Sequence, residues 1–258
     1  MKLAKFILYK LNQISVYFYY TAKPHRINPI YYLRLINEGN ATINLRRNYE
    51  ELFQEICGLI ARSGSTGGEF ADYLELYQTV KRIKPNYILE CGSGITSLVI
   101  AYALQENFRE TGRKGKLISM EENEYYHTQI RDLFPQEYIA FVDFKLSERK
   151  ERFFGNLLGS YYEEIPKYPY ELMYIDGPTE RKSSSSKKCF NADLLNLVES
   201  SGQLTKFTAL LDQRITTLWA FQKLLPSANI SYSPVKQLTR ITLSKQTDPP
   251  VGVNTLSV

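Results

Sequence analysis

The chain has 258 residues, of which 43% are hydrophobic and 23% are charged, and its formal net charge is +5. This composition excludes a disordered chain and suits one α/β domain with an N-terminal extension. The mild positive charge permits an anionic ligand or an acidic membrane surface and requires neither. Its three cysteines are too far apart for a metal-binding signature, and so few are typical of a reducing cytoplasm.

The first 20 residues are apolar and aromatic, with three lysines as their only charges. A membrane-spanning helix needs about 20 nearly continuous apolar residues, and Lys10, Asn12 and Gln13 interrupt this stretch. A signal peptide also fits poorly, because the apolar core is broken and no small-residue cleavage site follows. We therefore expect a helix that packs on the domain or on a partner. A basic amphipathic helix lying on a membrane surface is the alternative.

Residues 21–47 contain two prolines, several asparagines and a glycine, and we predict an irregular connection there. Apolar residues then recur at helical spacing in two segments, which predicts helices over 49–61 and 69–83. The glycine-rich segment 63–68 separates them.

Residues 87–97 carry the strongest functional signal. A short apolar run over 87–89 predicts a strand that ends in the acid Glu90, and Gly92 and Gly94 follow at alternate positions. A helical pattern opens at Ser97. Strand, glycine turn and helix are the first unit of a nucleotide-binding βαβ fold. The glycines let the backbone approach a ligand where a Cβ would collide.

Four more apolar runs predict strands, over 116–120, 138–142, 170–175 and 208–211. The acids that follow them are, in order, Glu121, Asp143, Asp176 and Asp212. Because Glu122 is adjacent to Glu121, the register of that strand end is open by one residue. Ligands of open α/β sheets lie at the carboxyl ends of the strands. Each acid alone could cap a helix, but five in succession indicate a binding edge.

The pattern acid-x-Gly-x-Gly-x-Thr from Glu90 to Thr96 resembles motif I of the class I S-adenosylmethionine-dependent methyltransferases. The resemblance covers roughly residues 65 to 245. It implies an α/β fold with a Rossmann-like seven-stranded sheet, mostly parallel with a final antiparallel strand, and helices on both faces. Residues 231–244 fit the last strand pair. The chain then divides into a helical extension (1–64), a methyltransferase domain (65–245) and a tail (246–258).

The resemblance also implies roles for residues at the strand ends. In the family, the first acid helps to hold the methionine end of the cofactor, and the glycine turn passes under it. The acid after the second strand binds the ribose hydroxyls, and a side chain after the third contacts the adenine. The S-adenosylmethionine-binding residues implied here are Glu90, Gly92, Ser93, Gly94, Thr96, Glu121, Asp143 and Asp176. Helices before motif I cover the cofactor in such enzymes, so segment 63–68 is either part of that cover or a plain linker.

Two alternatives stay open. A dinucleotide site needs a third glycine at position 97, where Ser97 stands, and the acid Glu90 suits a positive ligand better than a pyrophosphate. A Rossmann-fold NAD(P)-dependent oxidoreductase, which these two features disfavour, is one alternative. A methyltransferase-like protein that binds the cofactor or a partner without turnover is the other.

Methyl transfer to oxygen requires a group that removes the proton. Histidine is the commonest base, but His25 lies in the irregular N-terminal segment and His127 lies on the cofactor flank. Asp176 and Asp212-Gln213 resemble the Asp, Asp-Asn set that binds Mg²⁺ in catechol-type and related sugar O-methyltransferases, with Gln213 in place of the asparagine. Either Mg²⁺ activates the acceptor hydroxyl, or Asp176 or Asp212 acts as the catalytic base without a metal.

The resemblance to bacterial tailoring enzymes implies a small-molecule or glycan acceptor that is methylated on a hydroxyl. The basic, serine-rich run 181–188 follows Asp176, so it either attracts an anionic group of the acceptor or is a solvated loop. A nucleic-acid partner is not expected, because the tyrosines are spread along the chain and form no basic aromatic patch. We expect a cytoplasmic protein, with membrane contact through residues 1–20 as the alternative. The sequence leaves the oligomeric state open.

Overall fold

The computed structural model of the protein describes residues 29–63, 68–180, 188–201 and 207–243. The apolar stretch 1–20, most of the basic run 181–188 and the tail 246–258 lie outside these residues. No helix in the described part of the chain is long and apolar enough to cross a membrane.

The main sheet has the strand order β3-β2-β1-β6-β8-β10-β9. Its strands are β1 (Tyr87–Cys91), β2 (Lys116–Glu121), β3 (Val142–Leu146), β6 (Leu172–Ile175), β8 (Phe207–Asp212), β9 (Asn229–Ser233) and β10 (Leu238–Leu243). Strands β3, β2, β1, β6 and β8 pair in parallel, and β10 pairs antiparallel with both β8 and β9. The predicted seven-stranded, mostly parallel sheet with an antiparallel strand near its end is confirmed. The connections reverse direction between β1 and β6, which is where open α/β sheets bind ligands.

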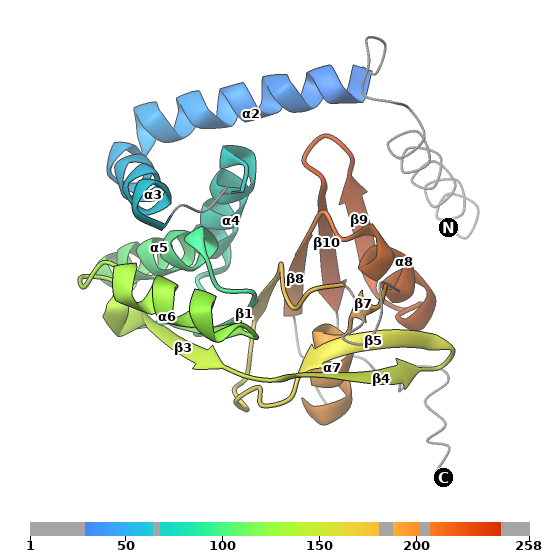
Figure 1. Ribbon diagram of the computed structural model, residues 1–258. Helices are drawn as coiled ribbons and strands as arrows, with labels where there is room; N and C mark the ends of the chain where they lie inside the picture. Colours follow the sequence, from blue (N-terminus) through green and yellow to red (C-terminus); the bar gives the residue numbers. More distant parts are fainter. Residues whose placement is uncertain (1–28, 64–67, 181–187, 202–206, 244–258) are drawn as a thin grey trace.

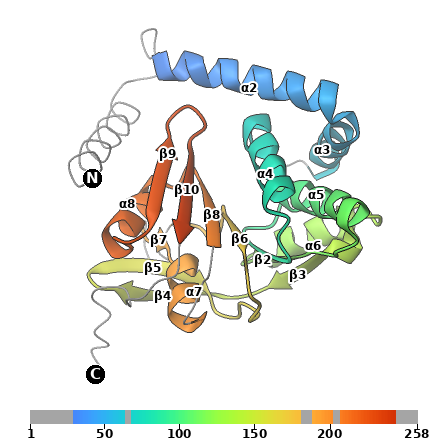
Figure 2. The ribbon, with the colours of Figure 1, turned by 180° about the vertical axis from the view of Figure 1, so that it is seen from behind.

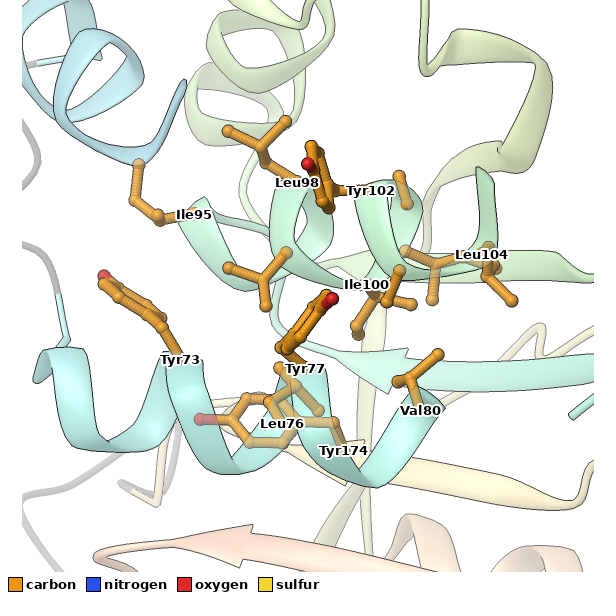
Figure 3. Close-up of a cluster of buried hydrophobic side chains, with 14 of the residues drawn as sticks. Tyr73, Leu76, Tyr77, Val80, Ile95, Leu98, Ile100, Tyr102, Leu104 and Tyr174 are labelled. Atoms are coloured by element: carbon orange, nitrogen blue, oxygen red, sulfur yellow. The ribbon is translucent and has the colours of Figure 1, made fainter. Parts of the chain in front are cut away.

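Helices cover both faces of this sheet (Figures 1 and 2). One face carries α3 (Glu50–Ser63), α4 (Phe70–Ile83), α5 (Ile95–Thr111) and α6 (Glu124–Leu133), and the other carries α7 (Asp193–Ser201) and α8 (Ile215–Leu224). Alternate strand residues face opposite sides, so Ile88 packs in the first core and Leu89 in the second. Figure 3 shows the first core, in which Tyr73, Leu76 and Tyr77 of α4 pack with side chains of α5 and with Tyr174 of β6.

A small second sheet lies on the α7 side of the fold. It consists of β4 (Arg149–Phe154), β5 (Leu157–Tyr162) and β7 (Phe190–Asn191), in the order β4-β5-β7. Strands β4 and β5 form an antiparallel hairpin. Strand β5 ends at Tyr162, which lines the cavity described below.

The predicted irregular connection over 21–47 is wrong for its described part, which is the helix α2 (Pro29–Asn48). Proline is favoured at the first position of a helix, where its missing N–H has no partner to lose. Helix α2 runs across the top of the view in Figure 1 and packs against α3 and α4. The Glu38 carboxylate of α2 accepts the backbone N–H groups of Phe70 and Ala71 at 2.8 and 2.9 Å, and so caps the start of α4.

The predicted third strand over 138–142 is also wrong. Residues Ile139–Phe141 form a 3-10 helix, η1, and β3 begins only at Val142. The apolar side chains there are buried because they pack under α5: Tyr138 contacts Tyr102, and Phe141 contacts Phe108. A short apolar run does not distinguish a strand from such a turn.

Candidate functional site

A cavity of about 600 Å³ opens at the carboxyl ends of β1, β2, β6 and β8. This volume lies in the usual range of small-molecule sites. The turn after β1, the N-terminal end of α4 and the residues after β6 and β8 form its wall. The lining residues are Gly68, Asp72, Tyr73, Gly92, Ser93, Gly94, Ile95, Thr96, Glu121, Glu122, Tyr162, Tyr174, Asp176, Gly177, Pro178, Thr179, Asp212, Gln213 and Arg214.

The two glycines of the first turn have different environments. Gly92 has a φ of +98°, and a Cβ on it would lie 2.8 Å from the backbone N of Gly177. The neighbouring turn of the protein therefore requires this glycine. A Cβ on Gly94 would meet no atom within 4 Å, and Gly94 lines the cavity. Of the two, Gly94 is the one whose backbone is open to a ligand.

Glu90 lies behind the turn and is not part of the cavity wall. Its carboxylate accepts hydrogen bonds from Thr96 Oγ1 and Ser119 Oγ, both at 2.6 Å, and from Ser97 Oγ. Burial raises the pKa of Glu90 to about 7, and the three hydroxyl donors act against this rise. Ser97, which replaces the third glycine of a dinucleotide motif, also accepts the N–H of Gly94 at 3.1 Å. Glu90 thus holds the turn and the first residues of α5 in place. It contacts the cavity wall through its hydrogen bond with Thr96, which is a lining residue.

Glu121 is the last residue of β2 and lines the cavity beside the glycine turn. Its Oε1 accepts the backbone N–H groups of Glu122 and Asn123, and its Oε2 accepts the N–H of Ser93 at 3.3 Å. The carboxylate of Glu122 is held elsewhere, by the N–H of Thr179 at 2.8 Å. The strand end that the sequence left open by one residue is therefore Glu121.

Asp143 does not lie at the binding edge. It is the second residue of β3, pairs in register with Ile118, and forms an ion pair with Lys145 at 3.2 Å. The expectation that it follows the third strand fails because that strand begins four residues later than predicted. Leu146 ends β3, and Ser147 follows it.

Asp176 and Asp212 follow or end neighbouring strands, and the structure brings both into the cavity wall. The side chain of Asp176 is 49% exposed, and Arg214 Nη2 lies 3.1 Å from its Oδ1. Arg214 Nη1 donates to the carbonyl of Pro178 at 3.0 Å. Burial raises the pKa of Asp212 to about 7, the Asp176 carboxylate adds to this rise, and Arg214 opposes it.

The predicted Mg²⁺ site at Asp176, Asp212 and Gln213 does not fit the geometry. In the described part of the chain, no three Asp, Glu, His or Cys side chains gather as a metal-binding group. The guanidinium of Arg214 already donates to Oδ1 of Asp176. Mg²⁺ demands a near-octahedral set of oxygen ligands, and a guanidinium bonded to one of the candidate ligands opposes a second cation there.

Sequence reasoning missed Asp72, which extends from α4 into the same cavity. Only 4% of this residue is exposed, and its buried Oδ1 has no hydrogen-bond partner among the described residues. Burial raises the pKa of Asp72 to about 8, and the Asp212 carboxylate is the next cause. A signal was present: Asp72 shares a helix face with Leu76 and Thr79, which are both buried.

Tyr162 was missed as well. It is fully buried on β5 and lines the cavity, and its hydroxyl has no partner in the part of the chain that the structure describes. The signal for its hairpin was the pair Gly155-Asn156 between two runs rich in aromatic residues.

No family model and no curated protein matches this chain. Solved structures are similar at low identity. An O-methyltransferase from Bacillus cereus in complex with SAH is 11% identical over 90% of this chain and 97% of its own, with a TM-score of 0.46. The SAH-bound methyltransferase PaMTH1 from Podospora anserina is 16% identical over 92% of this chain and 96% of its own, with a TM-score of 0.45. A methyltransferase from Geobacter sulfurreducens is 9% identical over 90% of this chain and 96% of its own, with a TM-score of 0.45. At these values the fold assignment rests on the strand order.

Proposed function

We propose that the protein is an S-adenosylmethionine-dependent methyltransferase that methylates a hydroxyl of a small molecule or glycan. The observation that carries this proposal is the charge of the cavity wall. Five carboxyl groups line it, on Asp72, Glu121, Glu122, Asp176 and Asp212, and the one cation that lines it among the described residues, Arg214, is bonded to one of them. A wall so rich in acidic groups favours a ligand with a sulfonium and an ammonium over one with a pyrophosphate.

The cofactor half of the cavity lies between the glycine turn and β2. Glu121 is placed to accept the ribose hydroxyls, because its Oε2 holds one long bond only, from Ser93 N, among those of the described residues. Gly94 and Thr96 line the part of the cavity that we assign to the methionine end. When bound, S-adenosylmethionine supplies a methyl group on a positively charged sulfur.

The other half of the cavity holds the carboxylates that can take a proton from an acceptor hydroxyl. A general base works best when its pKa is near the working pH. Asp212 meets this condition with a pKa of about 7, whereas Asp176 is already paired with Arg214. Asp212 is therefore the favoured base, and Asp176 and Arg214 hold the loop after β6 in place.

The test is a calorimetric titration of S-adenosylhomocysteine into wild type, Glu121→Gln and Glu124→Gln. Glu124 is an exposed acid on the neighbouring helix and serves as the matched control. Hydrogen bonds to a charged group contribute about 1.5 to 3 kcal/mol, so Glu121→Gln should weaken binding roughly 10- to 100-fold. The control should bind like wild type.

Two results would contradict the proposal. If S-adenosylhomocysteine gives no heat with wild type while NADH binds, the oxidoreductase alternative gains. If S-adenosylhomocysteine binds but a broad panel of hydroxylated acceptors stays unmethylated, the protein is a binding module on the same fold.

A further inference from the structure

The carboxylate of Asp72 is buried in the cavity wall without a partner. An unpaired buried carboxylate is costly, because water no longer solvates its charge and nothing replaces it. Acids this deeply buried are normally paired. The hydroxyl of Tyr162 is a second fully buried polar group on the same wall without a partner among the described residues. Two such groups in one cavity indicate a ligand that completes their interactions.

The charges around Asp72 define what that ligand must carry. Asp212 from β8, Glu69 from the start of α4 and Glu38 from α2 all add negative charge around Asp72, and Arg34 of α2 opposes them. The side chain of Arg34 is bonded to Glu69, by Nε at 3.1 Å and through Nη2. The Glu38 carboxylate is used by the N–H groups at the start of α4.

The charge of Asp176, on the same wall, is also compensated within the protein. Arg214 is bonded to Asp176 and to the carbonyl of Pro178. Among the described residues, the neighbouring cations Arg34 and Arg214 are thus bonded to other groups. Asp72 and Asp212 line the cavity, and each has one buried oxygen without a hydrogen-bond partner in that part of the chain. A neutral ligand could donate hydrogen bonds here, but only a cation would stabilise the ionised form of these carboxyl groups.

We propose that Asp72 binds a positively charged amine of the acceptor, and that the neighbouring Asp212 carboxylate adds to the negative charge that attracts it. Resting on the methyltransferase function proposed above, this defines the acceptor class as an amino alcohol or amino sugar. An acidic acceptor is disfavoured, because its charge would face two carboxylates. The basic run 181–188 suggested an anionic acceptor, but its residues 181–187 lie outside the described part of the chain.

The test uses three two-carbon probes that differ in charge: 2-aminoethanol, ethylene glycol and glycolate. Each is titrated at pH 8 by ligand-observed NMR into protein saturated with S-adenosylhomocysteine. We expect 2-aminoethanol to bind wild type at least about tenfold more tightly than the other two. Asp72→Asn keeps the shape of the side chain and removes its charge, and should abolish this preference. Asp132→Asn, which neutralises an exposed acid on α6, should keep it.

Each other result overturns the inference. Equal binding of 2-aminoethanol and ethylene glycol by wild type refutes a cation subsite, whatever the variants do. An unchanged preference in Asp72→Asn removes Asp72 from the subsite. If Asp72→Asn weakens S-adenosylhomocysteine itself, Asp72 holds the cofactor and not the acceptor. Should Asp72→Asn fail to fold, Asp212→Asn gives the same comparison.

The proposed function fails separately from this inference. It fails if wild type does not bind S-adenosylhomocysteine at all. In that case the three probes are titrated into the free protein, where a preference for 2-aminoethanol still supports the cation subsite.

Discussion

Gly92 and Gly177 bring the turns after β1 and β6 into direct backbone contact. A Cβ built on Gly92 lies 2.8 Å from Gly177 N, and one built on Gly177 lies 2.7 Å from both the N and the Cα of Gly92. The same Cβ on Gly177 would lie 2.7 Å from the hydroxyl oxygen of Tyr162. The two central turns of the binding edge therefore support each other, and the cavity floor has no room for a side chain at either position.

Gly92→Ala should destabilise the folded protein by at least about 2 kcal/mol, from the positive φ and the contact with Gly177 together. Urea denaturation measures this change. Gly39→Ala is the control, because Gly39 lies in the middle of α2 and a Cβ on it would meet no atom within 4 Å. Alanine should stabilise that helix by up to about 1 kcal/mol. A Gly92→Ala protein as stable as wild type would show that the two turns move apart at little cost.

Gly94→Ala should leave stability nearly unchanged and weaken S-adenosylhomocysteine binding about tenfold or more. Its φ of 177° is extended backbone that alanine adopts freely, and the added methyl group would project into open space at the cavity. The affinity falls only if a ligand approaches that backbone closely. Calorimetry on Gly94→Ala and Gly92→Ala separates the two effects. Unchanged affinity in Gly94→Ala would place the ligand away from the turn.

The central strands were predictable because buried parallel strands are short, continuous apolar runs. Strands β1, β2, β6 and β8 are such runs, and each predicted segment lies within two residues of the observed one at both ends. The acids Glu121, Asp176 and Asp212 were found for the same reason, since a polar residue marks where each run leaves the core.

The rest depended on tertiary contacts that one sequence does not display. The run before β3 is apolar because Tyr138 and Phe141 pack under α5. Helix α2 has little amphipathic pattern of its own, and only two of its residues, Ala41 and Leu45, are buried. Asp72 belongs to the site because α4 brings it close to Asp212 at the end of β8. The signal that the sequence offered was its position on the buried face of α4.

Arg214→Met should raise the pKa of Asp212 above about 7. The guanidinium favours the ionised form of that carboxyl, so its removal shifts the titration to higher pH. Carboxyl carbon NMR across a pH series measures the change. Arg214→Lys keeps the positive charge and should move the pKa less. If the pKa of Asp212 stays the same in Arg214→Met, the charge of Arg214 does not affect Asp212, and Asp176 is the carboxylate that it stabilises.

Glu38→Ala should destabilise the protein by about 1 to 2 kcal/mol, since α4 would lose the carboxylate that accepts two of its first N–H groups. Hydrogen exchange should accelerate for the amides of Phe70 and Ala71 more than for those of α5. The exposed acid variant Asp132→Asn is the control for loss of negative charge. Equal exchange in Glu38→Ala and wild type would mean that water replaces the cap without cost.

Asp193 should make the protein less stable as the pH rises. This acid is fully buried at the start of α7, where the N–H of Tyr162 donates to its Oδ1 at 2.8 Å, and burial raises its pKa to about 8. The unfolded chain loses the proton near pH 4, whereas the folded chain keeps it until about pH 8. The stability from this group is therefore complete below about pH 4 and is lost as the pH rises through about 8.

Asp193→Asn has no such proton to lose, so its stability relative to wild type should increase between pH 5 and pH 8. We expect the increase to exceed about 1.4 kcal/mol, the value of one pKa unit. Urea denaturation at both pH values gives the difference, and Asp132→Asn, an exposed acid, should show almost none. Parallel stability curves for Asp193→Asn and wild type would mean that Asp193 is ionised in the folded protein, paired with a group such as Arg214 that already favours its charged form.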